Sequence, residues 1–494
     1  MDNKIWRKKP LEAYEADIKK NELKRVLGKW SLTAIGIGAI IGGGIFVLTG
    51  TGAHNHAGPA LALSFVVAGV ACIFAALCYA EFSSMLPVEG SAYAYAYGTV
   101  GEIFAWLIGW GLVLEYAMGA MTVAVSWSRY FTKFIHLIFK IDIPFWLIND
   151  PISAANYALE HKIAAPNFAL ILPAFLIVWI VTAVLVKGIK EAASANNIIV
   201  LMKVCAVIFV IIAGAFFINV NNWHPFIPDV TTILVEGKER EAYGWGGIMS
   251  GASAIFFAYI GFDAVSTQAG EAINPRKDMP FAIIVSLLVC TVLYILVSLV
   301  LTGMINYKDI VGDGLDAPVA YAFEKVNQPW AVFIVTAAAT VGLLSVMLVM
   351  MLGQSRIFLG MAKDGLLPSF FRSVHPKFRT PWKSNILIGI VVSLVASVTP
   401  INILGNMTSF GTLFAFAMVC LAVWLLRIKS PELERTFKVP ALPIIAILGI
   451  LTNIYLIIQL DILAKIGAIS WLALGVVVYF VYSKRHSNLE QKNN

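Results

Sequence analysis

The chain has 494 residues, of which 59% are hydrophobic and 13% are charged, and its formal net charge is +7. A soluble protein of this length could not cover so apolar a core, so the composition excludes a soluble globular fold and indicates an all-α polytopic membrane protein. Most of the 36 lysines and arginines fall in a few loop segments, and no basic stripe is interleaved with aromatic residues, so the charge requires no nucleic-acid partner.

Apolar runs close to the ~20 residues that a helix needs to cross a bilayer occur about twelve times. No signal peptide is expected, because the chain opens with a polar, basic stretch that ends at Trp30. Lysine and arginine gather on the side of the N-terminus, so the positive-inside rule predicts a cell-membrane protein with both termini in the cytoplasm. The predicted spans are 31–51, 58–80, 101–127, 166–187, 192–218, 245–266, 281–304, 329–353, 385–399, 408–427, 439–460 and 464–483.

Two of these spans are interrupted, the first at Gly36–Phe46 and the sixth at Phe256–Asp263. A helix in hydrocarbon must satisfy its backbone polar groups internally, so a break is tolerated only where it lines a cavity. Breaks five spans apart lie on helices that run in opposite directions, which is typical of a transporter with an inverted repeat and its substrate site at the breaks.

This organisation predicts two halves of five spans each, followed by an appended hairpin. The outer loops are too short for a convincing independent domain. The predicted segments are a cytoplasmic N-terminal segment 1–30, a first repeat 31–218, an extracellular loop 219–243, a second repeat 244–427, a cytoplasmic link with two accessory spans 428–483, and a cytoplasmic tail 484–494.

The chemistry of a broken helix favours a zwitterionic ligand. The amides that open its second half carry the positive end of the helix dipole and bind an anionic group such as a carboxylate. The carbonyls that close the first half can accept hydrogen bonds from an ammonium. Together they predict a site for the head group of an α-amino acid, with the amides of Gly42, Gly43 and Gly44 and the backbone around Ile40, Ile41, Phe257, Ala258 and Ile260.

A simpler interpretation of the glycines is close helix packing, as in GxxxG faces. For one glycine-rich span alone the two interpretations are equally good. Two breaks in corresponding positions favour the substrate site.

Several motifs in order also resemble a known family. They are Gly36–Phe46, Cys78–Phe82 with Pro87 and Gly90–Tyr93, Gly261–Ala264, and Asn274-Pro275 with Pro280. Over nearly the whole chain this set resembles the amino acid–polyamine–organocation superfamily, and within it the bacterial relatives of the cationic amino acid transporters. The resemblance implies the LeuT-like fold of five-plus-five inverted repeats with broken first and sixth helices. It also implies amino acid uptake by proton symport or by exchange.

Charged residues inside the spans are costly and are therefore candidates for function. Glu115 lies in the middle of the third span, where its carboxyl group suits proton coupling or a structural hydrogen bond between helices. Lys190 opens the fifth span, and by similarity to the family it projects toward the first helix, where sodium-coupled members of the fold hold a sodium ion. It could instead snorkel to the interface or pair with Glu191. Lys203, deeper in the same span, is the weaker candidate because the family resemblance does not point to it.

Two further acids are predicted to act in gating or structure. Glu81 lies near the cytoplasmic end of the second span, where it is expected to cap a helix or form an ion pair at the inner gate. Asp263 follows the sixth-span break directly and is expected to accept hydrogen bonds from the freed backbone amides.

Selectivity is predicted to come from side chains that face the space between the breaks. Phe262 resembles the aromatic residue that covers the substrate in this fold, and Met350 matches a position that lines the distal pocket in relatives. A flexible apolar methionine fills the room that a long cationic side chain would need, so we expect a neutral substrate. Met350 could also be simple packing between helices.

The resulting hypothesis is proton-coupled uptake of small to medium neutral L-amino acids by alternating access. The alternatives are sodium-independent exchange, transport of cationic amino acids, and a nutrient sensor built on a transporter scaffold. Neither enzyme activity nor a cofactor nor a metal is expected, because no nucleophile or His/Cys grouping occurs near the interface. The last two spans offer a surface that a small accessory subunit or a second protomer could cover, and the oligomeric state is open.

Overall fold

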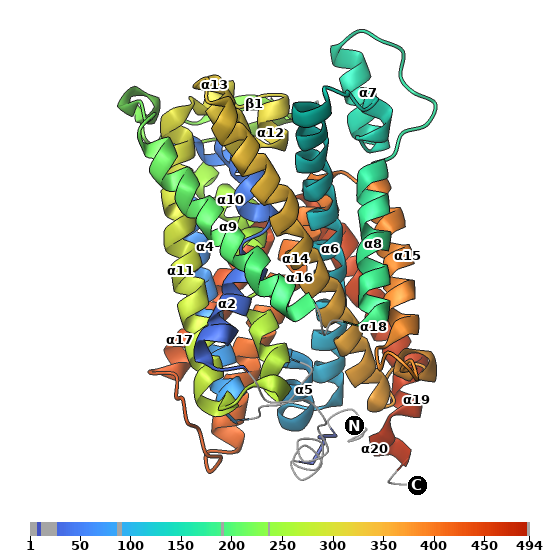
Figure 1. Ribbon diagram of the computed structural model, residues 1–494. Coiled ribbons are helices and arrows are strands. Elements are labelled where there is room, and N and C mark those ends of the chain that lie inside the picture. Colours follow the sequence, from blue (N-terminus) through green and yellow to red (C-terminus); the bar gives the residue numbers. More distant parts are fainter. Residues whose placement is uncertain (1–6, 11–26, 86–90, 189–191, 236–237, 492–494) are drawn as a thin grey trace.

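The computed structural model describes residues 7–10, 27–85, 91–188, 192–235 and 238–491 of the chain. They form an upright bundle of long helices, and the first and last described segments lie at the same end of it (Figure 1). Lys9 Nζ donates to the Asp364 carboxylate at 3.0 Å, and the amide of Asn488 donates to the Asp364 backbone carbonyl at 3.1 Å. We call this the terminal end of the bundle.

The long helices appear in an order close to that predicted. From the start of the chain they are α2 (Lys29–Ile40), α4 (Leu61–Met85), α6 (Glu102–Phe139), α8 (Leu172–Lys187) and α9 (Ala192–Ala215). Then come α10 (Gly244–Ala254), α11 (Pro275–Met304), α14 (Pro329–Lys363), α15 (Trp382–Val398), α16 (Ile401–Lys429), α17 (Leu442–Gln459) and α18 (Ile462–Val478).

Short elements cap the two ends of the bundle. At the terminal end lie α5 (Ser91–Thr99), α19 (Lys484–His486) and α20 (Asn488–Gln491) (Figure 1). At the opposite end lie α7 (Pro151–Glu160), α12 (Asp313–Asp316), α13 (Pro318–Lys325) and the antiparallel hairpin of β1 (Thr231–Val235) and β2 (Lys238–Ala242) (Figure 1). The hairpin lies in the predicted outer loop 219–243, for which the sequence indicated no strand.

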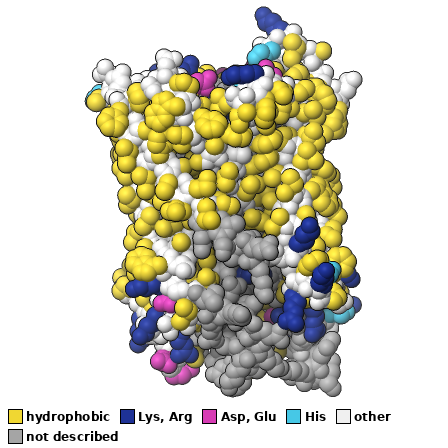
Figure 2. All heavy atoms as spheres, in the orientation of Figure 1, with side chains coloured by type: hydrophobic (Ala, Val, Ile, Leu, Met, Phe, Trp, Pro, Cys, Tyr) yellow, Lys and Arg dark blue, Asp and Glu magenta, His cyan; other side chains and the backbone are white. Residues whose placement is uncertain are grey.

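The surface agrees with a membrane environment. By length and apolarity, eight helices in the described part of the chain can cross a membrane, and the bent pair Gly244–Ala254 and Phe256–Gln268 makes a ninth. Figure 2 shows a broad band of hydrophobic side chains between two ends where charged residues gather. The chain is therefore a helical, multi-pass membrane protein, and the exact count of twelve spans stays a prediction.

Three of the extensive helix pairs join equivalent spans of the two predicted repeats. They are α6 with α14, α4 with α11, and α8 with α15, and in each pair the second helix is five places later in the predicted series of spans. Other extensive pairs, such as α6 with α16 and α2 with α11, do not follow this spacing. Through α11 and α4 the bundle packs against α2 and α10, the helices that lead into the two breaks.

Helix α6 is longer than its predicted span of 101–127. The predicted span stops where the run of apolar residues stops. The helix itself continues to Phe139 and ends where Lys140 adopts a left-handed conformation with φ of 56°. The extra turns bring α6 to α12 and α13, where Arg129 pairs with Asp316 and Lys133 pairs with Glu324.

Candidate functional site

The first break separates α2 from the helical turn η2 (Gly44–Leu48). Helix α2 ends at Ile40, and Ile41 is extended with φ of −68° and ψ of 100°. Gly43 precedes the new helical segment. Amides at the start of a helix have no acceptor inside it, so the new helical segment begins with free donors at the glycines to which the sequence analysis assigned a carboxylate.

The second break lies after α10. Helix α10 (Gly244–Ala254) is bent by 46° relative to the segment Phe256–Gln268. Within that segment η7 (Phe256–Tyr259) is followed by the extended Ile260, and η8 (Asp263–Glu271) begins three residues later. Gly261 has φ of 123°, a conformation that side chains disfavour. A Cβ at Gly261 would also lie 2.8 Å from the Ala39 carbonyl oxygen, so glycine is required here for two reasons.

The two breaks touch each other. Gly261 lies against Ala39, and Gly44 lies so close to Ala258 that a Cβ would collide with the Ala258 backbone. From the first contact to the second, the residue number rises from 39 to 44 in the first broken helix and falls from 261 to 258 in the second. The two broken helices therefore cross in opposite directions. The contact that the inverted repeat predicts is present.

Tyr294 of α11 joins the carbonyls of both breaks. Its buried hydroxyl lies 2.8 Å from the Ile40 oxygen and 2.9 Å from the Ala258 oxygen. One hydroxyl proton serves one acceptor at a time, so these two carbonyls retain unused hydrogen-bonding capacity. Both were predicted acceptors for an ammonium. The sequence analysis missed Tyr294, although a tyrosine in the middle of an apolar span was a visible signal.

Lys203, on α9, contacts the first break. Its side chain is 1% exposed, and its Nζ donates to the backbone oxygens of Gly38 at 2.5 Å and Ile41 at 2.9 Å. Gly342 of α14 leaves room for the lysine stem, because a Cβ there would lie 2.6 Å from Lys203 Cδ. Lys190, to which this contact with the first helix was assigned, lies outside the described residues. The signal for Lys203 in the sequence was a charged residue in the middle of an apolar span.

Glu115 and Asp263 form a buried acidic pair at the second break. Asp263 accepts hydrogen bonds from the Tyr116 hydroxyl at 2.9 Å and from the Gly261 amide at 3.3 Å. Glu115 is fully buried, and within the described part of the chain neither of its carboxylate oxygens has a hydrogen-bond partner by distance and angle. The Thr412 side chain is close enough to interact with the Glu115 carboxylate, although not in good hydrogen-bond geometry, and Asp263 is the acidic group that faces it.

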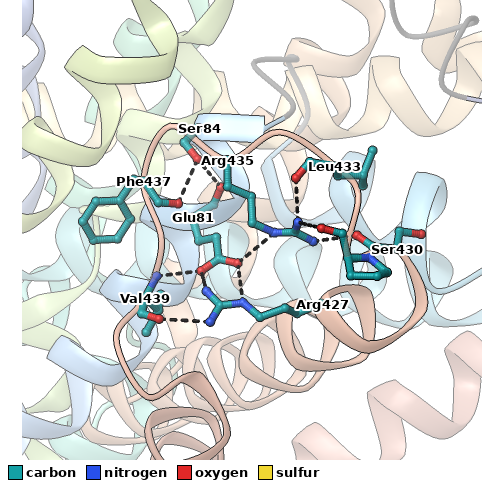
Figure 3. A network of polar contacts seen from close by, with 9 residues as sticks. Glu81, Ser84, Arg427, Ser430, Leu433, Arg435, Phe437 and Val439 are labelled. Carbon is teal, nitrogen blue, oxygen red and sulfur yellow. Dashed lines mark hydrogen bonds and ion pairs between the residues drawn. The ribbon is translucent and has the colours of Figure 1, made fainter.

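Glu81 stands in a different environment, at the terminal end of α4 (Figure 3). The guanidinium of Arg427 donates to both of its carboxylate oxygens, and Arg435 Nε lies 3.3 Å from one of them. The amide of Val439 donates to the same carboxylate at 2.7 Å. Glu81 is fully buried, so the two arginines and the Val439 amide take the place of solvent around its carboxylate.

Arg435 also organises the loop that it belongs to. It donates to the backbone oxygens of Ser430, Pro431 and Leu433 at 2.8, 3.1 and 2.6 Å. The connection between α16 and α17 is thereby wrapped around one guanidinium and fastened to α4 through Glu81 (Figure 3).

Phe262 and Met350 are both buried in the region of the breaks. Phe262 packs against Tyr79 and Phe416, with ring centroids 6.0 and 4.8 Å apart. Met350 of α14 is 2% exposed and faces Gly119 of α6. The structure thus brings Met350 next to the helix that carries Glu115.

The fold and this site define a membrane transporter with its centre at two broken helices. The model of the family described as amino acid permease matches residues 27–490, and the chain belongs to that family, within the amino acid–polyamine–organocation superfamily.

Individual relatives agree with this assignment. The chain is 43% identical over 492 residues to the branched-chain amino acid permease BcaP of Bacillus subtilis, covering 99% of this chain and 100% of that protein. It is 42% identical over 488 residues to the methylthioribose transporter of Bacillus subtilis, with 99% of each chain covered. It is also 37% identical over 412 residues to the vacuolar cationic amino acid transporter 4 of Arabidopsis thaliana, covering 83% of this chain and 65% of that one.

Proposed function

We propose that this protein takes up small to medium neutral L-amino acids, coupled to protons, by alternating access. The substrate carboxylate binds the amides of Gly42, Gly43 and Gly44, where the dipole of the new helix segment is positive. The ammonium binds the carbonyls of Ile40 and Ala258, in competition with the Tyr294 hydroxyl. The mutual contact of the two breaks supports this assignment, because it brings donors and acceptors to one place.

The observation that carries the coupling proposal is the contact of Lys203 with the first break. An ammonium bonded to the Gly38 and Ile41 carbonyls occupies oxygens that a sodium ion would otherwise need. A sodium-independent cycle follows from this. We assign to Lys203 the role that the family resemblance suggested for Lys190.

Glu115 is proposed to carry the proton change. No cation among the described residues acts on Glu115, so its carboxyl group can gain or lose a proton without breaking a described ion pair. Its electrostatic interaction with Asp263 connects that change to the second break, and Asp263 holds the Gly261 amide at the bend. Protonation at Glu115 therefore alters the balance between the open states of the broken helices.

Gating is proposed to involve two places, the second break and the terminal end of the bundle. Asp263 acts at the break, and Glu81 fastens α4 to the α16–α17 connection at the terminal end. We place the terminal end in the cytoplasm, because lysine and arginine are enriched in the loops there. This orientation puts uptake in the inward direction across the cell membrane.

Proteoliposomes loaded with unlabelled amino acids test the proposal by counterflow of labelled alanine, leucine, threonine and arginine. Empty vesicles under an inward proton gradient then test accumulation. Accumulation of a neutral amino acid that a protonophore abolishes supports symport. Counterflow without accumulation makes the protein an exchanger, uptake of arginine alone makes it a cationic transporter, and binding without any transport makes it a sensor.

A Met350→Ser variant tests the assignment of the distal pocket. Serine removes most of the side chain that fills the space beside Gly119, so larger or cationic amino acids should become substrates. Unchanged selectivity would mean that Met350 only packs helices. Because a relative with 42% identity is named for methylthioribose, that compound is included as a competitor in the same assay.

A further inference from the structure

The connection between α14 and α15 is basic and has no acid of its own. We call residues 365–383 the basic link. It carries four lysines and arginines and neither aspartate nor glutamate, and the four are Arg372, Lys377, Arg379 and Lys383. The first three are exposed, and Lys383 is partly exposed. The positive charge of the link is therefore not neutralised by its neighbours in the chain.

The basic link lies at the terminal end of the bundle, just below a face that meets lipid. It follows directly on Asp364, to which both ends of the described chain are bonded. Figure 2 shows lysine and arginine side chains at this end, where the hydrophobic band stops. On α15, Lys383, Ile390 and Leu394 are seven and four residues apart and share one side of the helix. Ile390 and Leu394 are exposed apolar side chains, and seven residues of helix measure ~10 Å, so Lys383 stands about two turns below lipid-facing residues.

Exposed apolar side chains are interleaved with the basic ones. Phe370, Val374 and Phe378 are between 38% and 47% exposed. The Lys383 ammonium lies 5.7 Å from the centre of the Phe370 ring, and the Lys377 ammonium lies 5.8 Å from that of Phe378. Aromatic rings beside lysine are typical of the bilayer interface, where the ring contacts the acyl region and the ammonium reaches the phosphates.

The turn that presents Lys377 and Arg379 is closed by its own hydrogen bonds. The His375 amide donates to the Thr380 carbonyl at 2.8 Å, and the Arg379 amide donates to the His375 carbonyl at 2.8 Å. The Thr380 hydroxyl donates to the Val186 carbonyl, at the end of α8, at 2.8 Å. The basic side chains therefore stand on a fixed backbone, and a ligand does not have to order a loose loop.

We infer that the basic link binds the headgroup of an anionic phospholipid in the leaflet at the terminal end. The lipid phosphate accepts hydrogen bonds from the lysines and arginines, and the acyl chains lie along the apolar side chains of the link and of α15. A lipid with a net negative charge is favoured over a zwitterionic one, because the link offers no carboxylate to a choline group. A lipid is favoured over a soluble anion, because the cations adjoin exposed apolar side chains. This inference does not depend on which substrate the protein transports.

Site-resolved cross-linking tests the inference on the full chain in phosphatidylcholine vesicles. The vesicles contain a small fraction of a photoactivatable phosphatidylglycerol or of the matching phosphatidylcholine probe, and mass spectrometry maps the labelled peptides. We expect the phosphatidylglycerol probe to label residues 365–383 severalfold more than the phosphatidylcholine probe. The double variant Lys377→Gln with Lys383→Gln should lower this labelling about twentyfold, because each lysine at a membrane surface contributes about a fivefold factor in affinity.

Two further double variants separate charge from structure. Lys377→Arg with Lys383→Arg keeps the charge and should be labelled like the wild type. Lys140→Gln with Lys162→Gln is the matched control, because it removes two exposed lysines at the opposite end of the bundle. Its labelling of the basic link should also equal that of the wild type.

Three results would overturn the inference. The first is equal labelling of the basic link by the two probes. The second is labelling by phosphatidylglycerol that persists in Lys377→Gln with Lys383→Gln. The third is loss of labelling when inorganic phosphate is added at constant ionic strength, which would show that the link binds free phosphate and not a lipid.

Discussion

Two fully buried glutamates, on α4 and α6, stand in opposite electrostatic situations. Glu81 receives two guanidinium groups and a backbone amide, whereas no described residue makes a hydrogen bond of good geometry to Glu115, whose polar neighbours are Thr412 and another acid, Asp263. A buried charge is stable only when it is paired and hydrogen-bonded. The difference teaches that burial alone does not define a role: Glu81 is enclosed by cationic donors and fastens two segments together, whereas Glu115 lacks such partners, and for this reason we propose that it carries the proton change.

The largest effect is expected from Glu81→Gln. It leaves Arg427 and Arg435 buried or half-buried without their counter-charge, which costs about 3–5 kcal/mol. We expect a strongly lowered apparent Tm in detergent and poor recovery of monodisperse protein. A variant with the thermal stability of the wild type would mean that the cluster does not hold the terminal end together.

Glu115→Gln is expected to have the opposite effect to Glu81→Gln, because it should alter proton-coupled transport and leave thermal stability almost unchanged. The substitution keeps the shape of the side chain, and the amide oxygen can still accept from Thr412, so the apparent Tm should stay within a few degrees of the wild type. Accumulation driven by the proton gradient should fall about a hundredfold or more, because glutamine has no titratable group to carry the proton. Counterflow should fall much less. Equal loss in both assays would contradict a role in coupling.

Lys203→Met extends the comparison to a buried cation. Methionine retains the bulk of the lysine stem but leaves the Gly38 and Ile41 carbonyls without their donor. We expect accumulation to be lost while the protein still folds. Lys190→Ala serves as the control that separates the two lysines. If it abolishes accumulation and Lys203→Met does not, the sequence-based assignment of Lys190 was the better one.

The smallest effect is expected from Tyr294→Phe, which removes a neutral donor. The hydroxyl contributes about 1 kcal/mol as an ordinary hydrogen bond, equivalent to roughly a fivefold change in substrate affinity. A competitor for the Ile40 and Ala258 carbonyls is removed at the same time, so binding should tighten if the ammonium uses them. Weaker binding by a similar factor would show that Tyr294 orders the breaks before the substrate arrives. Substrate-induced thermal shifts can measure either direction.

The membrane helices and the two breaks could be predicted from the sequence. Long apolar runs specify membrane helices because hydrocarbon forces each segment to satisfy its own backbone. The glycines at 42–44 and 261 indicated both breaks, and at Gly44 and Gly261 an added Cβ would collide with the backbone of the other broken helix. The antiparallel crossing of the breaks followed from counting the spans between them. These inferences needed only neighbouring residues or the number of membrane crossings.

What the tertiary structure alone decided is which distant side chains meet. Hydropathy places Lys203 within α9, but only packing against α14 and α2 directs its ammonium to the first break. Glu81 and Arg427 lie 346 residues apart in the chain, and no local pattern pairs them. Gly119 resembles any glycine of a membrane helix until α14 and α16 close around it. Periodicity defines a face of a helix, whereas the partner of that face depends on the global arrangement of all the helices.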